Sequence, residues 1–77
     1  MKVFTASWCA PCAAYKNEIQ DVENVEIIDV EERMDLGIAY GVQSVPLTVF
    51  EREGEITHRV SGVLPLAQVT SLRAQFE

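Results

Sequence analysis

Basic residues are scarce in this chain of 77 residues, which has six Lys and Arg against twelve Asp and Glu and a formal net charge of −6. Affinity for nucleic acid depends on cations that displace counterions from phosphates. The basic residues here are few and scattered, so no nucleic-acid partner is expected. The chain also lacks an apolar run of the roughly 18 residues that a membrane-spanning helix needs, so no membrane partner is expected. Residues 1–4 lead into strand-like sequence rather than a signal peptide, which favours a cytoplasmic location.

Cysteine is also scarce, with Cys9 and Cys12 the only two in the chain. A bridge between them encloses a loop too short to restrain much of the unfolded chain, which excludes a disulfide-stabilised scaffold. Together with the single His58 they supply three ligands, whereas a structural zinc site needs four. Haem attachment requires a His directly after the second cysteine, and residue 13 is Ala. We therefore expect no metal site, and the two cysteines must be explained as a pair.

The overall composition indicates a small folded protein. Hydrophobic residues make up 48% of the chain and charged residues 23%, which is ordinary for a globular domain. The sequence contains no internal repeat, low-complexity segment or linker that would divide it. We therefore expect one domain over residues 1–77.

Residue patterns predict elements in the order β-α-β-α-β-β-α. Runs of apolar and β-branched residues predict strands at 3–6, 25–30, 47–51 and 56–60. Apolar residues at helical spacing predict helices from residue 10 along a face that ends at 22, over 31–40, and from 65 to the C-terminus. A helix between the first two strands makes them parallel with a right-handed crossover, and residues 52–55 have the composition of a hairpin turn. The expected fold class is α/β, with a mixed four-stranded sheet between helices.

The segment from Trp8 to Cys12 reads Trp-Cys-Ala-Pro-Cys and lies between a predicted strand and a predicted helix. It resembles the Trp-Cys-Gly-Pro-Cys site of thioredoxins and differs from it at one position. Val45-Pro46 resembles the cis-proline step of that family, and Gly62 falls where its substrate-groove glycine falls. Residues 40–42 and 50–54 also match family patterns. The resemblance covers essentially the whole chain and implies a thioredoxin-like fold in a protein of glutaredoxin size.

The position of the dithiol implies different roles for its two sulfurs. Two residues between cysteines on the first turn of a helix leave Cys9 exposed at the helix N-terminus and Cys12 further in. The helix dipole favours a thiolate on Cys9, and a hydrogen bond from the Cys12 thiol is expected to add to this effect. Residues expected to contact substrate are Trp8, Ala10, Pro11, Val45, Pro46 and Gly62. No role in the site is expected for two other residues: Tyr15 is expected in the core, and His58 is expected to face solvent.

The resemblance implies a thiol-disulfide oxidoreductase that reduces protein disulfides. Cys9 attacks a substrate disulfide, and Cys12 then attacks Cys9 and releases the reduced substrate. No bound cofactor is expected, since NADPH would enter only through a reductase. The stretch from Gly62 to Pro65 lacks the acid that glutaredoxins use in their glutathione pocket. The expected electron donor is therefore a flavoprotein of the thioredoxin-reductase type. The protein itself is expected to be a monomer. The alternatives are a glutaredoxin-like electron donor, for example to ribonucleotide reductase, and a non-catalytic binding subunit with the same fold.

One departure from the resemblance concerns the proton of Cys12. Ordinary thioredoxins place a buried acid on the strand that leads into the motif, and the matching residue here is Val3. The usual Lys neighbour of that acid matches Val25, so the charged pair is absent as a whole. We therefore expect slower resolution of mixed disulfides near neutral pH than in family members that have the acid.

Overall fold

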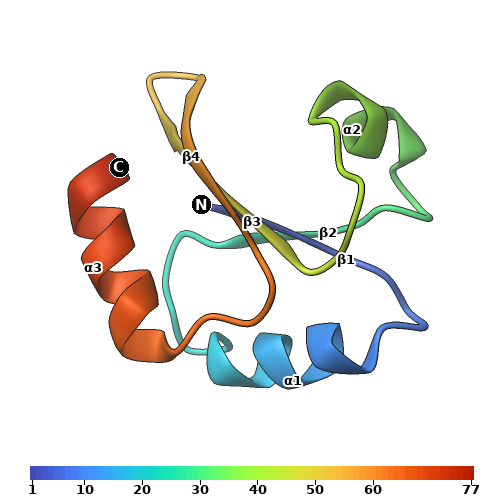
Figure 1. Ribbon diagram of the computed structural model, residues 1–77, viewed down its shortest axis with the longest axis horizontal. Coiled ribbons are helices and arrows are strands. Elements are labelled where there is room, and N and C mark those ends of the chain that lie inside the picture. The colour runs from blue at the N-terminus through green and yellow to red at the C-terminus, as the bar shows by residue number, and fades with distance from the viewer.

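A mixed four-stranded sheet forms the centre of the computed structural model, which describes residues 1–77 (Figure 1). The elements in chain order are β1 (Lys2–Thr5), α1 (Ala10–Glu18), β2 (Glu26–Asp29), α2 (Met34–Ala39), β3 (Leu47–Arg52), β4 (Glu55–Ser61) and α3 (Leu66–Phe76). The strand order is β2-β1-β3-β4. β1 pairs with β2 in parallel and with β3 antiparallel, and β3 pairs with β4 antiparallel. The predicted order and strand directions are confirmed.

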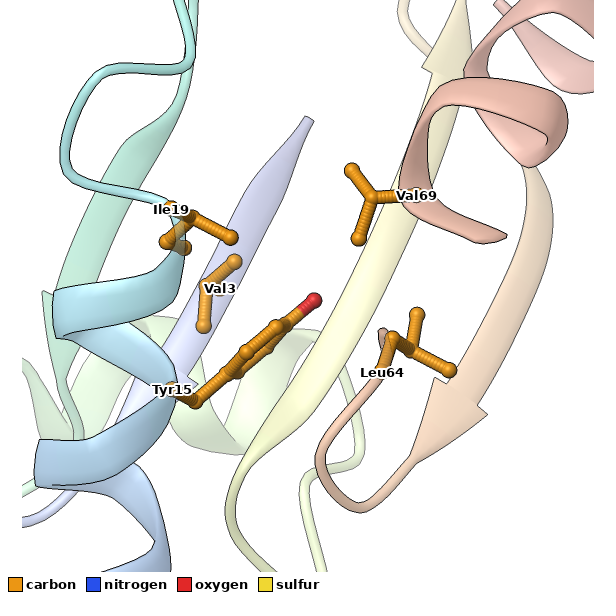
Figure 2. Close-up of a cluster of buried hydrophobic side chains, with 5 residues drawn as sticks. All are labelled: Val3, Tyr15, Ile19, Leu64 and Val69. Carbon is orange, nitrogen blue, oxygen red and sulfur yellow. The ribbon is translucent and has the colours of Figure 1, made fainter. Parts of the chain in front are cut away.

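Side chains that alternate along β1 divide the core between the two faces of the sheet. Val3 packs with Tyr15 and Ile19 from the α1 segment and with Val69 from α3. Figure 2 shows these side chains together with Leu64 on one side of the sheet. Phe4 points the other way, into a cluster that α2 helps to cover. α1 and α3 thus cover one face and α2 the other, which confirms the prediction of a sheet between helices (Figure 1).

The β3–β4 hairpin turns at Glu53 and Gly54, where the sequence predicts it. Both residues have positive φ, of 54° and 83°, as in the tight turns whose twist matches that of antiparallel strands. Phe50 pairs with His58 and Glu51 with Ile56, so Thr57 is the extra residue of a bulge in β4. Gly41, after α2, has φ of 64°, a left-handed conformation that suits glycine just beyond the end of a helix.

Two helices are shorter than their sequence patterns predict. α1 ends at Glu18, with Ile19 as its C-cap, so Val22 lies beyond the helix although it packs against the same core. The second helix is predicted from residue 31, but α2 begins at Met34. The preceding residues turn around Asp29, which accepts a hydrogen bond on Oδ1 from the N–H of Glu31 at 2.8 Å. Local side-chain capping of this kind competes with helix formation.

Three expectations about α3 and the residues that it contacts are also wrong. Pro65 is the N-cap residue in an extended conformation, rather than the first helical residue, and α3 begins at Leu66. Leu66 belongs to the predicted apolar face but is 43% exposed. His58 does not simply face solvent, because its ring stacks on Phe76 of α3 with 4.2 Å between ring centroids. The C-terminal end of α3 therefore lies against this part of the hairpin, and the imidazole is half-buried. None of the helices combines the length and apolar character that a membrane crossing requires.

Candidate active site

The two cysteines lie at the start of α1, directly after the loop that follows β1. Cys9 is the N-cap residue and has an extended backbone, with φ of −93° and ψ of 104°. Pro11 occupies the first turn, where its missing N–H removes no intrahelical hydrogen bond. Cys12 completes that turn, which places the two Cα atoms 5.2 Å apart and allows the disulfide that joins them. The local sequence therefore positions a redox pair at a helix N-terminus.

The backbone and side chains around the two sulfurs distinguish Cys9 from Cys12. The backbone N–H of Cys12 donates a hydrogen bond to Sγ of Cys9 at 3.2 Å. Sγ of Cys9 also lies 3.8 Å from the carbonyl oxygen of Val45. Cys9 is 6% exposed and Cys12 is fully buried. The expected order of exposure holds, but the expectation of an exposed Cys9 is wrong, because Ala6 and Val45 pack against the pair.

The loop before β3 brings Val45 and Pro46 to the dithiol, and the bond between them is cis, as the resemblance to thioredoxins implies. Two contacts from the β4 side fix this loop. The N–H of Gly62 donates to the carbonyl oxygen of Pro46 at 2.9 Å, and the guanidinium of Arg59 donates to the carbonyl oxygen of Gly41 at 3.1 Å. Gly62 has φ of 95°, a backbone conformation that favours glycine whether or not a substrate approaches this residue. The structure thus links three predicted site residues, Val45, Pro46 and Gly62, to the cysteines.

Trp8 lies beside the dithiol on the surface and is 72% exposed. It lines a hollow of about 120 Å³ together with Val30, Val42, Gln43, Ser44 and Val45. Ala10 and Pro11 are exposed at the start of α1. We call this space the Trp8 hollow, and a substrate segment that reaches Cys9 can contact it.

The sequence interpretation missed Val30, Val42, Gln43 and Ser44. One signal was present for Val30, which directly follows β2. The N–H of Val30 donates to the carbonyl oxygen of Thr5 at 2.9 Å, so the ends of two parallel strands meet here. Ligand sites in α/β sheets form at such carboxyl ends. The residues of the loop before β3 carried no comparable signal.

The interior behind the dithiol contains no carboxylate. Val3 is fully buried, and the only polar residues in the buried set are Thr5 and Thr48. The hydroxyl of Tyr15 lies 2.8 Å from that of Thr48 in a hydrogen bond. Burial raises the pKa of Tyr15, against the opposing effect of this hydrogen bond, so the phenol stays neutral at physiological pH. No group in this interior is suited to accept the proton of Cys12.

Comparison with known proteins agrees with this geometry. A family model described as a thioredoxin-like domain matches residues 1–77, which is the whole chain. The chain belongs to the thioredoxin-like family. Thioredoxin from Mycoplasma pneumoniae is 32% identical, with 94% of this chain and 76% of that protein covered. Thioredoxin H7 from Arabidopsis thaliana is also 32% identical, but the match covers 80% of this chain and only 53% of that protein.

Solved thioredoxin structures confirm the thioredoxin-like fold. A point mutant of the thioredoxin from Halobacterium salinarum NRC-1 superposes with a TM-score of 0.89 at 31% identity, covering 97% of this chain and 71% of that one. Thioredoxin 1 from Thermosipho africanus TCF52B is 20% identical and supports the fold alone, with a TM-score of 0.83 and 90% of its chain covered. Family membership and the cysteine pair at the start of α1 together support thiol-disulfide exchange as the chemistry of this thioredoxin-like site.

Proposed function

We propose that this thioredoxin-like protein reduces disulfides in protein substrates. The thiolate of Cys9 attacks one sulfur of the substrate disulfide and displaces the other as a thiolate, which takes up a proton. The thiolate of Cys12 then attacks Sγ of Cys9 and displaces the second substrate sulfur. The substrate gains two electrons and leaves as a dithiol, and the protein is left with the Cys9–Cys12 disulfide.

The different surroundings of the two sulfurs are the observation that supports this function and the order of attack. The N–H of Cys12 points at Sγ of Cys9 from 3.2 Å and stabilises negative charge there, and the helix N-terminus acts in the same sense. Cys9 is also the only one of the two with any exposed surface. Cys9 is therefore the attacking sulfur, and Cys12, held on the same helical turn, is the resolving sulfur. An intramolecular second step is favoured because the two sulfurs need not diffuse together.

The surface around Cys9 supports a polypeptide substrate. The Trp8 hollow adjoins the dithiol, and Val45 presents its carbonyl oxygen 3.8 Å from Sγ of Cys9. An extended substrate segment can pair with backbone groups of this kind. The hydrogen bond between Gly62 and Pro46 holds the loop that carries Val45. Ala10 and Pro11 form the exposed start of α1, next to Cys9.

The proposed electron donor is a flavoprotein of the thioredoxin-reductase type, with NADPH used by that enzyme and no cofactor bound to this chain. The segment after β4 supports a preference over glutathione. Gly62, Val63, Leu64 and Pro65 supply no charged side chain to pair with the ionised groups of glutathione. Exposed apolar surface at Trp8 and Val63 instead suits a protein partner.

Insulin reduction tests the proposed function. With dithiothreitol as electron source, the wild-type protein is expected to accelerate precipitation of the insulin B chain, and Cys9→Ser is expected to give the uncatalysed rate. Ile56→Gln is the matched control, because Ile56 is an exposed apolar residue on β4 at the hairpin. Equal rates for wild type and Cys9→Ser would contradict the proposal and favour a non-catalytic binding subunit.

A coupled assay tests the electron donor separately. NADPH oxidation is followed with insulin as substrate, once with thioredoxin reductase and once with glutathione and glutathione reductase. We expect turnover with the first system. Turnover only with the second would make the protein a glutaredoxin-like electron donor and would leave the dithiol mechanism intact.

A further inference from the structure

A polar hollow of about 160 Å³ lies between the loop before β3 and strand β4. We call it the Arg59 hollow. Leu47 is the only apolar residue in its lining, which otherwise consists of Gly41, Gln43, Ser44, Arg59 and Ser61. The lining therefore combines one positive charge with an amide and two hydroxyls, and it contains no acid. Donors of this kind around a guanidinium suit the binding of an oxyanion.

The pairing of β3 with β4 places Arg59 and Ser61 on the face of the sheet that α2 covers. Arg59 lies opposite Val49, and Ser61 lies opposite Leu47. Residues directly opposite each other in an antiparallel pair share a face, and Val49 and Leu47 belong to the cluster on the α2 side. Both β4 side chains are exposed, because β4 is an edge strand. The guanidinium and the hydroxyl are thus open to a ligand from the same side.

The guanidinium of Arg59 is held in place but keeps most of its donors free. One N–H donates to the carbonyl oxygen of Gly41 at 3.1 Å, and this is the only hydrogen bond of the side chain. No carboxylate of this chain lies within ion-pair distance of Arg59, although three other bases are paired with acids. A guanidinium carries five N–H donors in a planar fork, which matches the two oxygens of a carboxylate. The unpaired fork therefore favours a carboxylate as the ligand.

The acids on this side of the molecule do not occupy the hollow. Glu51, on β3, is paired with Lys2. The acids within residues 31–35 lie around the start of α2, whereas Gly41 follows its end, and a helix of this length rises about 9 Å. Glu55 is four residues away along β4, or about 13 Å. Both separations exceed the screening length of about 8 Å at physiological ionic strength, so the local charge at the hollow is positive.

The Arg59 hollow adjoins the surface beside the dithiol. Gln43 and Ser44 line both this hollow and the Trp8 hollow, so only these loop residues separate Arg59 from the surface next to Cys9. A polypeptide held at Cys9 therefore presents its nearby side chains to Arg59 at a high effective concentration. A free anion has no such tether and approaches a chain of net charge −6. A carboxylate that belongs to a polypeptide is thus the favoured occupant.

We propose that the Arg59 hollow is a carboxylate-binding site that receives an aspartate or glutamate side chain of a protein substrate, close to its target cysteine. The guanidinium binds the carboxylate, and the hydroxyls of Ser44 and Ser61 donate to its remaining lone pairs. This inference rests on the proposed function and adds the substrate class. An exposed ion pair of this kind corresponds to a preference of about fivefold in rate for an acidic over a neutral peptide.

The test uses synthetic peptides in which one cysteine forms a mixed disulfide with thionitrobenzoate. The thiolate of Cys9 attacks the peptide sulfur and forms a new disulfide, and thionitrobenzoate leaves because its thiol has the lower pKa. The absorbance of thionitrobenzoate reports the rate. Each peptide carries Asp or Asn at one of several positions around its cysteine. Each Asp-to-Asn rate ratio is divided by the ratio found with dithiothreitol, which removes the intrinsic effect of the charge on the peptide disulfide.

Four reduced proteins are compared in single turnovers: wild type, Arg59→Gln, Ser61→Ala and Lys16→Gln. Lys16 lies on α1, on the other face of the sheet, so Lys16→Gln makes the same change in net charge outside the hollow. We expect a corrected Asp preference of about fivefold at one position in wild type. It should fall to about one in Arg59→Gln, fall in part in Ser61→Ala, and remain in Lys16→Gln.

Two measurements guard against a disturbed loop in Arg59→Gln. The rates with the Asn peptides show whether each variant keeps a working dithiol, and circular dichroism shows that it is folded. Ser61→Ala also tests the hollow while the contact between Arg59 and Gly41 stays in place.

A titration with acetate distinguishes a free carboxylate from one carried by a polypeptide. Amide signals of the lining residues are followed by NMR at constant ionic strength. We expect no saturation below about 50 mM, because an untethered ion loses its full translational freedom on binding.

Three results would overturn the inference. A corrected Asp-to-Asn ratio near one at every position in wild type removes the substrate site while the proposed function stands, and saturable acetate binding together with that ratio assigns the hollow to a free anion. A preference that Arg59→Gln and Ser61→Ala leave unchanged, or that Lys16→Gln lowers as much as Arg59→Gln does, shows that the hollow is not its origin. If no peptide releases thionitrobenzoate, the proposed function and the inference fail together.

Discussion

The backbone N–H of Cys12 donates a hydrogen bond to Sγ of Cys9 at 3.2 Å, so the resolving residue supports the attacking one through its main chain. The sequence interpretation expected this support from the Cys12 thiol. A backbone donor does not depend on the protonation state of that thiol. It therefore remains in place when Cys12 itself loses a proton for the second step of the reaction.

The first prediction concerns alkylation of the reduced protein. Substoichiometric iodoacetamide is expected to label Cys9, because a thiolate is favoured there and Cys12 is fully buried. Both cysteines lie in one tryptic peptide, so fragment spectra must locate the label. Label found mainly on Cys12 would reverse the proposed roles.

The second prediction concerns the pH dependence of the resolving step. Val3 is buried where an acid would assist Cys12, and the buried set contains no carboxylate. An unassisted thiol ionises near pH 8.5, so release of substrate from Cys9 is expected to keep accelerating up to about that pH. Stopped-flow fluorescence of Trp8 can follow the step. A rate that is already constant at pH 7 would show that Cys12 has another proton acceptor.

The third prediction concerns the buried pair of hydroxyls. Tyr15 and Thr48 lie 2.8 Å apart and are both fully buried (Figure 2 shows the phenol between Val3 and Leu64). Tyr15→Phe leaves the Thr48 hydroxyl without this partner, and we expect a loss of about 1–3 kcal/mol in the free energy of unfolding. Urea denaturation measures this loss.

A double-mutant cycle provides the control for that result. In Tyr15→Phe/Thr48→Val both polar groups are gone, so the double variant should be less destabilised than the sum of the single variants. Additive losses would show that the two hydroxyls do not stabilise each other.

The fourth prediction concerns the ion pair between Lys2 and Glu51, at the end of the sheet away from the dithiol. The hydrogen bond from Lys2, with a further one from the hydroxyl of Tyr40 at 3.0 Å, lowers the pKa of Glu51 from its ordinary value of 4.5, although burial opposes this. The ionised Glu51 therefore stabilises the folded state fully above pH 4.5, and this stabilisation is lost as the pH falls through the lowered pKa of Glu51. The same pair raises the pKa of Lys2, so the contribution at alkaline pH is lost only above 10.5.

Glu51→Gln tests this pH window. At pH 7 the variant is expected to unfold more easily by about 1 kcal/mol, and the difference from wild type should shrink below about pH 4.5. Urea denaturation at a series of pH values measures it, with Glu55→Gln on β4 as an exposed control. A difference that stays constant down to pH 3 would contradict the ionic origin of the effect.

Features that are determined by residues close together in the chain were predictable from the sequence. The hairpin follows from Gly54 and its neighbours, and the parallel pairing of β1 and β2 follows from the helix between them. The resemblance to thioredoxins predicted the cis bond at Pro46. Each of these features depends on residues close together in the chain or on one short motif.

Features that depend on packing between distant segments were not predictable. His58 is half-buried because Phe76, at the far end of α3, lies on its ring. Cys9 is less exposed than expected because the loop that carries Val45 closes on it. The Trp8 hollow likewise combines Trp8 from before α1, Val30 from after β2 and residues of the loop before β3. No pattern within one segment reports these contacts.

Intact-protein mass spectrometry of Cys12→Ser gives the most direct test of the account's central claim, that Cys9 attacks and Cys12 resolves. After incubation with an oxidised peptide substrate, the mass of the variant should rise by one substrate unit, the adduct should lie on Cys9, and dithiothreitol should remove it. An unmodified Cys12→Ser protein, or an adduct that forms on Cys9→Ser instead, would contradict the claim.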